Sequence, residues 1–370
     1  MQTAINRRHL GQLLLGAALV AALDRTDAAP ASGTRIRLSM PGGPAPSDED
    51  LRFMRDIGAL NVYVGIAPKS EFDSVAGLQE IRRRYAAGGV TVSDVRNMQV
   101  TTQLADVLLG RPGAQQRIEN FKTWLRTCGG AGFGYTVAQA SVLGVLTSGT
   151  GPIRNGIEGR EVDASKPLYT GLGPAMPGGQ AAPRQYYSND ALAADRRYTP
   201  EEIWENYTRL VREIAPVAEE QRVSVGFHPD DPPITELGGI PRIFATFADC
   251  KKAIAIANSP RIGICLCAGT FAEGIADPAT AIRYFGARRK MWEVHFRNVT
   301  APLPLFRETF QDDGYYDMYK VMEALVAVDF DGVVHYDHAV PMVGGVRSYA
   351  AYAQGYMKAL LQRAQRARGR

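Results

Sequence analysis

Metal-binding side chains are concentrated in the second half of the 370-residue chain. Apart from His9, each histidine lies within or at the end of a short apolar run, and so do two of the four cysteines. One such residue lies near the end of each of four successive runs, and the set is His228, Cys267, His295 and Asp337. Two imidazoles, a thiolate and a carboxylate suit a divalent transition metal, whereas Mg²⁺ and Ca²⁺ prefer oxygen ligands alone. A lone histidine or cysteine is more often a core residue, so the prediction depends on the four occurring together.

The composition of this set also indicates what the metal would do. A thiolate and a carboxylate together neutralise a divalent cation, and an open position on Mn²⁺, Fe²⁺ or Zn²⁺ would let a hydroxy acid chelate it. The cation would then act as a Lewis acid on developing enolate charge. A structural zinc site, the alternative, tends to close its shell with more sulfur.

Eight apolar runs that could carry these residues are expected to be buried strands, because they are β-branched or aromatic and bounded by glycine or polar residues. They cover residues 36–40, 60–66, 90–95, 133–138, 223–228, 262–269, 292–296 and 332–338. Helical patterns lie between most of them, at 112–127, 199–214, 247–258, 278–285, 316–328 and 347–367. The clearest helix opens with Thr199 as N-cap and Pro200 in the first turn.

This alternation predicts a single (β/α)8 barrel of the α/β class over residues 34–370. A doubly wound open sheet is the alternative, but no glycine-rich GxGxxG motif follows the first strand. Catalytic groups of such barrels lie at the C-terminal ends of the strands, where the four candidate ligands are found.

Side chains two apart on a strand share a face, and this sets further expectations. Cys265 and Cys267 should share a face, with Cys267 nearer the strand end as the ligand and Cys265 as packing. Likewise His335 and Asp337 should point one way and His338 the other, unless the strand has ended by then.

One segment breaks the alternation. Residues 146–198 are rich in glycine and proline and too long for a plain connection. We expect a loop that follows the fourth strand and folds over the top of the barrel; a surface insertion without structure is the alternative.

The N-terminus has the features of an export signal. Residues 1–29 combine a charged start, an apolar stretch and small residues before the expected cleavage point. The pair Arg7-Arg8 is similar to a twin-arginine signal, which would place the mature protein in the periplasm or outside the cell; an ordinary secretory signal or an uncleaved anchor is the alternative. Four cysteines are too few for a disulfide scaffold in so long a chain, so at least one should be free or bound to something.

The bulk composition excludes several other classes. Hydrophobic residues make up 45% and charged residues 22%, which are globular values and not those of a disordered or fibrous protein. The net charge is only +4 and the basic residues are scattered, so the sequence shows no basic patch that would indicate nucleic-acid binding. Beyond the signal no apolar run is long enough to span a membrane, so no membrane partner is expected after processing. Association into a homo-oligomer is left open by the sequence.

At the candidate ligands the chain resembles mannonate dehydratases, which belong to the xylose-isomerase-like barrels. The matching pieces are His228-Pro229-Asp230-Asp231-Pro232-Pro233, Gly239-Ile240-Pro241-Arg242, Cys267-Ala268-Gly269, His295-Phe296-Arg297-Asn298, Asp313-Gly314-Tyr315-Tyr316-Asp317-Met318 and Asp337-His338. The resemblance implies a Mn²⁺ or Fe²⁺ centre, with Zn²⁺ less favoured, and removal of water from a sugar acid to give a 2-keto-3-deoxy acid, as in hexuronate catabolism. Its ligand pattern falls on the same four residues, and its Asp-His pair gives an acid/base role to His338.

The mechanism implied by this resemblance needs further groups. The substrate would chelate the metal through its carboxylate and 2-hydroxyl, and Arg297 would help to hold the enediolate; a surface ion pair is the alternative for this arginine. His338 would either remove the proton beside the carboxylate or assist departure of the 3-hydroxyl, and Tyr349 or Tyr352 would carry the other step. Asn298, Arg242 and His335 are predicted substrate contacts, although Asn298 and Arg242 could equally anchor loops.

The chain also departs from the family. The last strand has His335-Tyr336-Asp337-His338-Ala339 where members usually have Arg-Pro-Asp-His-Gly, residues before about 200 match poorly, and most members carry no export signal. Two rival functions follow, a sugar isomerase or epimerase of the same barrel type and an exported sugar-acid binding protein without turnover. Product analysis separates them, because an isomerase conserves the mass of its substrate.

Overall fold

The computed structural model describes residues 35–174, 176 and 186–369. The predicted export signal, residues 1–29, lies outside the described residues. Part of the predicted 146–198 loop, residues 175 and 177–185, also lies outside them.

Eight parallel strands form the centre of the described chain. They are β1 (Ile36–Gly42), β2 (Asn61–Gly65), β3 (Thr91–Arg96), β4 (Tyr135–Ala138), β10 (Ser224–Phe227), β13 (Ile262–Cys267), β14 (Met291–His295) and β17 (Gly332–His335). Their hydrogen-bonded order is β3-β2-β1-β17-β14-β13-β10-β4, so each strand pairs with the next of the eight along the chain, except that β3 and β4 lie at the two ends of this order. At the seam between β3 and β4, the Thr136 hydroxyl donates to the Val95 carbonyl oxygen over 2.9 Å. All eight predicted strands are confirmed, and they form a nearly closed barrel.

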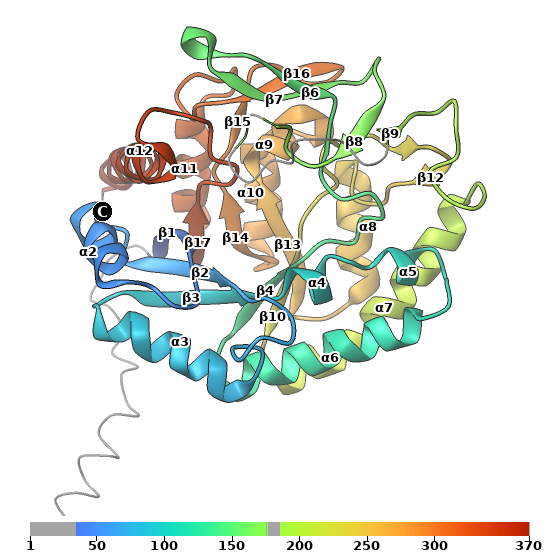
Figure 1. Cartoon of the computed structure of the whole chain (residues 1–370), viewed down its shortest axis with the longest axis horizontal. Helices are drawn as coiled ribbons and strands as arrows, with labels where there is room; N and C mark the ends of the chain where they lie inside the picture. Colours follow the sequence, from blue (N-terminus) through green and yellow to red (C-terminus); the bar gives the residue numbers. More distant parts are fainter. Residues whose placement is uncertain (1–34, 175, 177–185, 370) are drawn as a thin grey trace, which may run out of the picture. The chain divides into compact units, whose positions relative to one another are not determined.

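Helices surround this barrel (Figure 1). The longer ones are α2 (Asp48–Asp56), α3 (Val75–Ala87), α6 (Ala114–Gly130), α7 (Pro200–Glu220), α8 (Phe247–Ala257), α10 (Pro278–Ala287), α11 (Met318–Ala327) and α12 (Gly345–Ala367). The short ones are α4 (Met98–Thr101), α5 (Ala105–Leu108) and α9 (Ala268–Thr270). Within the described residues, none of the helices is long and apolar enough to cross a membrane.

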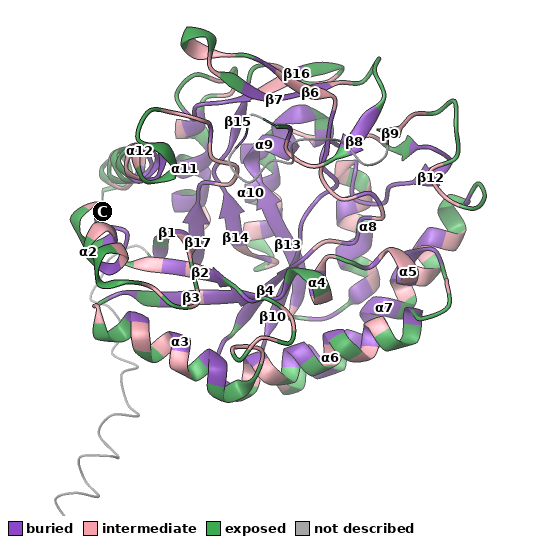
Figure 2. Cartoon of the chain, viewed as in Figure 1, coloured by how far each residue is buried: buried purple, intermediate pink, exposed green. Residues whose placement is uncertain are grey.

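Local sequence explains where these helices begin. In α7, Thr199 accepts a hydrogen bond from the Glu202 backbone and Glu202 bonds back to the Thr199 backbone, which is the predicted N-terminus with an added capping box. Its predicted apolar positions, from Ile203 to Ile214, are buried. Figure 2 shows the same division throughout, with buried strands inside and exposed outer helix faces.

The described part of the 146–198 segment forms short strands. It contains β5 (Leu146–Thr147), β6 (Gly149–Pro152), β7 (Glu158–Asp163), β8 (Leu168–Thr170) and β9 (Tyr186–Tyr187). β7 pairs antiparallel with β16 (Leu305–Thr309), which follows β14, and β16 pairs in turn with β15 (Asn298–Val299). We call the four strands β15, β16, β7 and β6 the lid sheet. It lies beyond the C-terminal ends of β13, β14 and β17 (Figure 1).

Candidate metal centre

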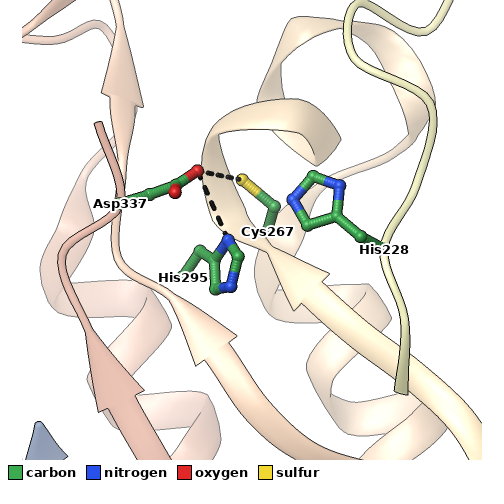
Figure 3. A group of neighbouring side chains, drawn as sticks. All are labelled: His228, Cys267, His295 and Asp337. Carbon is green, nitrogen blue, oxygen red and sulfur yellow. Dashed lines mark hydrogen bonds and ion pairs between the residues drawn. The ribbon is translucent and has the colours of Figure 1, made fainter. Parts of the chain in front are cut away.

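Four barrel strands bring the predicted metal ligands together at their C-terminal ends. His228 follows β10, Cys267 and His295 end β13 and β14, and Asp337 lies two residues beyond β17. One donor atom from each lies within 4.8 Å of the others. Figure 3 shows the four side chains converging from separate strands on one space.

The distances within this group leave room for a cation between the side chains. Asp337 Oδ2 lies 3.3 Å from His295 Nδ1 and 4.0 Å from Cys267 Sγ. The ring centroids of His228 and His295 are 4.9 Å apart. His295 Nδ1 is buried and faces Asp337 Oδ2, so the two atoms could bind one cation between them.

Contacts behind the two imidazoles set which nitrogen faces the centre. His228 Nδ1 lies 2.7 Å from the Pro229 carbonyl oxygen, and His295 Nε2 lies 2.8 Å from Glu293 Oε1. Both oxygens are acceptors, so the proton belongs on these nitrogens. The opposite nitrogen of each ring is then free to bind a metal, which is the usual arrangement of metal-binding histidines.

The electrostatics of the site favour anionic ligands. Burial opposes ionisation of Cys267, but the nearby charge of Arg297 and the two neighbouring imidazoles outweigh it and lower the pKa of the thiol to about 5. Burial likewise opposes ionisation of Asp337, yet the nearby charges of His338, His295 and Arg297 hold its pKa well below the usual range. A thiolate, a carboxylate and two imidazoles fit a divalent transition metal and do not fit Mg²⁺ or Ca²⁺.

Cys265 lies on the same face of β13 as Cys267, one step further into the barrel. Its Sγ is 3.3 Å from His295 Nε2, on the side of the ring away from the centre. Burial and the nearby Glu293 raise the pKa of its thiol to about 12. The shared face agrees with the prediction, and Cys265 stays a protonated neighbour of His295. Together with Cys128 and Cys250, both cysteines are free and buried.

A buried ionic network beneath the centre holds His295 in place. Glu293 Oε1 accepts hydrogen bonds from His295 Nε2 and from Arg96 Nη2 at 2.5 Å, and it lies 2.6 Å from His335 Nε2. Arg96 is also paired with Asp94. Glu293 was not among the residues predicted from the sequence, although it is a lone carboxylate two residues before His295 on the same face of an apolar strand.

The predicted substrate contact His335 lies in this network. Its Nδ1 is 2.6 Å from the Tyr336 carbonyl oxygen and its Nε2 contacts Glu293, so both ring nitrogens are occupied. The structure therefore places His335 behind the metal ligands, because it completes β17 inside the barrel. A direct contact with substrate stays a prediction.

The last strand ends earlier than the predicted 332–338. β17 ends at His335, so the alternation of faces no longer applies to Asp337 and His338. His338 Nδ1 lies 2.7 Å from Glu308 Oε1, and its Nε2 lies 3.7 Å from Asp337 Oδ2. Both residues of the pair thus reach the same site.

Arg297 is buried and not part of a surface ion pair. Its Nη1 lies 2.6 Å from Asp231 Oδ2 and 2.8 Å from Glu308 Oε1, and its Nη2 forms a close ion pair with Glu273. Nη1 is also 3.9 Å from Asp337 Oδ2. The positive charge of Arg297 therefore lies beside the metal centre, although three carboxylates already share it.

Two other predicted substrate contacts lie in anchoring positions. Asn298 Nδ2 donates to the carbonyl oxygens of Gln311 and Tyr316, so this amide holds the connection after β14. Arg242 Nε donates to Asp230 Oδ1 over 3.2 Å. Its two terminal nitrogens are buried without a hydrogen-bond partner among the described residues. Loop anchoring was the alternative for both residues.

The two candidate tyrosines differ in their surroundings. Tyr349 is buried, and burial first, followed by its neighbours Tyr352 and Glu308, raises its pKa well above the usual value. Tyr352 donates a hydrogen bond from its hydroxyl to Asp312 Oδ1 over 2.6 Å. Tyr349 therefore lies within electrostatic reach of the site, and the proton-transfer role of either residue stays a prediction.

The lid sheet contributes charged residues that the sequence analysis did not identify. Arg160, on β7, is fully buried and lies 2.6 Å from Asp231 Oδ1 and 2.5 Å from Glu308 Oε1. Burial opposes ionisation of Glu308, on β16, but His338 and the arginines Arg160 and Arg297 lower its pKa to about 2. No sequence signal joins Arg160 to Glu308, because 148 residues separate them.

Comparisons with known proteins point to one family. The family model of D-mannonate dehydratase matches residues 153–364. A mannonate dehydratase from Enterococcus faecalis is 40% identical over 144 residues, which cover 38% of this chain and 40% of that protein. Mannonate dehydratase 2 from Halalkalibacterium halodurans is 27% identical over 332 residues, covering 83% of this chain and 91% of its own. The crystal structure of mannonate dehydratase from Streptococcus suis serotype 2 matches the fold with a TM-score of 0.75 at 22% identity, covering 91% and 96% of the two chains.

Proposed function

The chain belongs to the mannonate dehydratase family, and on this premise we propose that it converts D-mannonate to 2-dehydro-3-deoxy-D-gluconate and water. It is a metal-dependent hydro-lyase acting on a sugar acid. The observation that carries the substrate proposal is the convergence of four mixed donors beside His338, whose Nε2 lies 3.7 Å from Asp337 Oδ2. A hydroxy acid bound between these donors would have its reacting carbons within reach of the imidazole.

We propose Mn²⁺ or Fe²⁺ for the centre, held by His228, Cys267, His295 and Asp337. The cation would act as a Lewis acid toward the substrate's carboxylate and 2-hydroxyl, which lowers the cost of removing the neighbouring proton. Two anionic ligands and two imidazoles match these metals, and the contacts behind the imidazoles keep one nitrogen of each ring free.

Side chains of the protein would transfer the protons and stabilise the negative charge that develops on the substrate. The C2 proton is removed, the 3-hydroxyl leaves with a proton as water, and the resulting enol rearranges to the 2-keto acid. His338 would carry one of these two transfers, because its Nε2 is turned toward Asp337 while Nδ1 contacts Glu308. Arg297 would add positive charge beside the developing anion.

The decisive experiment follows keto-acid formation from a panel of hexonates by the Mn²⁺- or Fe²⁺-reconstituted protein. We expect D-mannonate to give a 2-keto-3-deoxy product, and a product of unchanged mass would instead identify an isomerase or epimerase. His338→Asn should keep its metal but lose about 10²–10⁴ in rate, which is the usual contribution of general acid–base catalysis. Loss of metal from this variant would make His338 a ligand, and normal turnover would remove it from the mechanism.

We also propose that the protein works outside the cytoplasm, on the features of residues 1–29. Replacing both Arg7 and Arg8 with lysine should block twin-arginine export and leave the protein in the cytoplasm. Fractionation of cells that produce the two forms measures this. Unchanged export of the variant would indicate the general secretory route.

A further inference from the structure

His338 is held from the side opposite the metal centre. Its Nδ1 lies 2.7 Å from Glu308 Oε1, and the ring's other nitrogen is turned toward Asp337. Arg297 Nη1 also lies 3.2 Å from His338 Nδ1, but a guanidinium has only donors and the carboxylate only accepts. The proton at Nδ1 therefore points to Glu308, and Nε2 is left to exchange a proton with substrate.

The carboxylate that performs this role is itself fixed. In addition to its contact with His338, Glu308 Oε1 forms ion pairs with Arg160 Nη1 at 2.5 Å and with Arg297 Nη1 at 2.8 Å. Arg160 reaches it from β7 and Arg297 from the connection after β14, so two separate elements hold one oxygen. Glu308 and both arginines are buried, and a buried ion pair of this kind keeps its geometry well.

The cluster of Asp231, Glu308 and His338 could instead bind a second cation, but the neighbouring arginines disfavour this alternative. Donor atoms of Asp231, Glu308 and His338 do lie within 4.8 Å of one another. However, Arg160 and Arg297 are both paired with Asp231 and Glu308 already. A metal ion would have to displace or face two buried positive charges, whereas an imidazole N–H needs only one acceptor.

We propose that Glu308, carried by the lid sheet, is a positioning residue that orients His338 for proton transfer. The inference rests on the proposed function, in which His338 is the acid or base. Glu308 would act through His338, because its Oε1 contacts that imidazole, Arg160 and Arg297. It also gives the lid sheet a role in the reaction, because β16 supplies the carboxylate and β7 supplies the arginine that fixes it.

A double-mutant cycle with Glu308→Gln and His338→Asn tests this proposal in the full-length, metal-loaded protein. In the wild-type background, Glu308→Gln should lower kcat by at least about 10-fold, but by no more than the roughly 10²–10⁴ that acid–base help is worth, with KM and metal content nearly unchanged. In the His338→Asn background the same substitution should cost less than about twofold, because the imidazole that Glu308 orients is gone. Equal losses in the two backgrounds, or an effect on KM alone, would overturn the proposal.

A matched control comes from the same sheet. Glu161 on β7 is also paired with an arginine, Arg307, at 2.7 Å, and it makes no contact with His338. Glu161→Gln should therefore leave kcat unchanged. If it lowered kcat as much as Glu308→Gln, both substitutions would act by disturbing the lid sheet and not through His338.

The two proposals fail in distinguishable ways. Full activity of His338→Asn would reject His338 as acid or base, and absence of keto acid from every hexonate would reject the proposed function. In either case the melting temperatures of the wild type, the two single variants and the double variant still test whether Glu308 and His338 interact. Non-additive changes in Tm would support the Glu308–His338 pair, and additive changes would overturn it.

Discussion

At the scale of single residues, the two cysteines of β13 show how position decides chemistry. Cys267 ends the strand beside Arg297 and the imidazoles of His228 and His295, and its pKa is lowered to about 5. Cys265 lies two residues earlier, next to buried Glu293, and its pKa is raised to about 12. The same side chain therefore favours the thiolate form, as a metal ligand needs, at one position and the neutral thiol at the other.

Substituting each cysteine with serine separates these roles. Cys267→Ser should lose bound metal by at least about 10-fold in affinity, because a hydroxyl is a poor replacement for a thiolate on a transition metal. Cys265→Ser should retain most of its metal, since its sulfur lies behind His295. Metal content of the purified variants, measured by mass spectrometry, checks this; equal retention by both would remove Cys267 from the centre.

At the scale of elements, the barrel strands could be predicted and the lid sheet could not. Barrel strands such as β13 and β17 are fully buried runs of mostly apolar residues, so they can be recognised locally. The strands of the lid sheet, such as β6 and β16, are short and rich in glycine, proline or charge. They exist because β7 pairs with β16 far along the chain, which no local pattern records.

Arg160 joins the lid sheet to the barrel, and its loss should loosen that connection. Arg160→Met leaves Asp231 and Glu308 buried with one arginine in place of two, and breaking a buried pair costs about 3–5 kcal/mol. Arg154→Met is the matched control, because its pair with Asp312 is about one-third exposed and worth about 0–1 kcal/mol. Urea unfolding measures both changes. A similar cost for the two variants would show that Arg160 does not anchor the sheet.

At the scale of the whole molecule, the barrel explains why a site could be predicted without a structure. Parallel strands that close into a barrel bring their C-terminal ends to one mouth, so residues at those ends meet whatever their distance along the chain. This logic located His228, Cys267, His295 and Asp337, which the structure brings within 4.8 Å. It could not locate Glu308 or Arg160, because they reach the mouth from connections whose path the barrel does not dictate.

The metal centre joins four strands, so metal binding should stabilise the whole fold. A ligand that binds only the folded state adds about 2.7 kcal/mol of stability at 100 times its dissociation constant. For a chain of this length that corresponds to a rise in Tm of about 4 °C on adding Mn²⁺ to the chelator-treated protein. Cys267→Ser should lose at least about half of this rise at the same Mn²⁺ concentration, because a roughly 10-fold weaker affinity halves the stabilisation, whereas Cys265→Ser should keep it. Scanning calorimetry of the three proteins with and without Mn²⁺ measures the effect. An equal rise in all three would place the stabilising cation elsewhere, and no rise in the wild type would mean that Mn²⁺ does not bind these four residues.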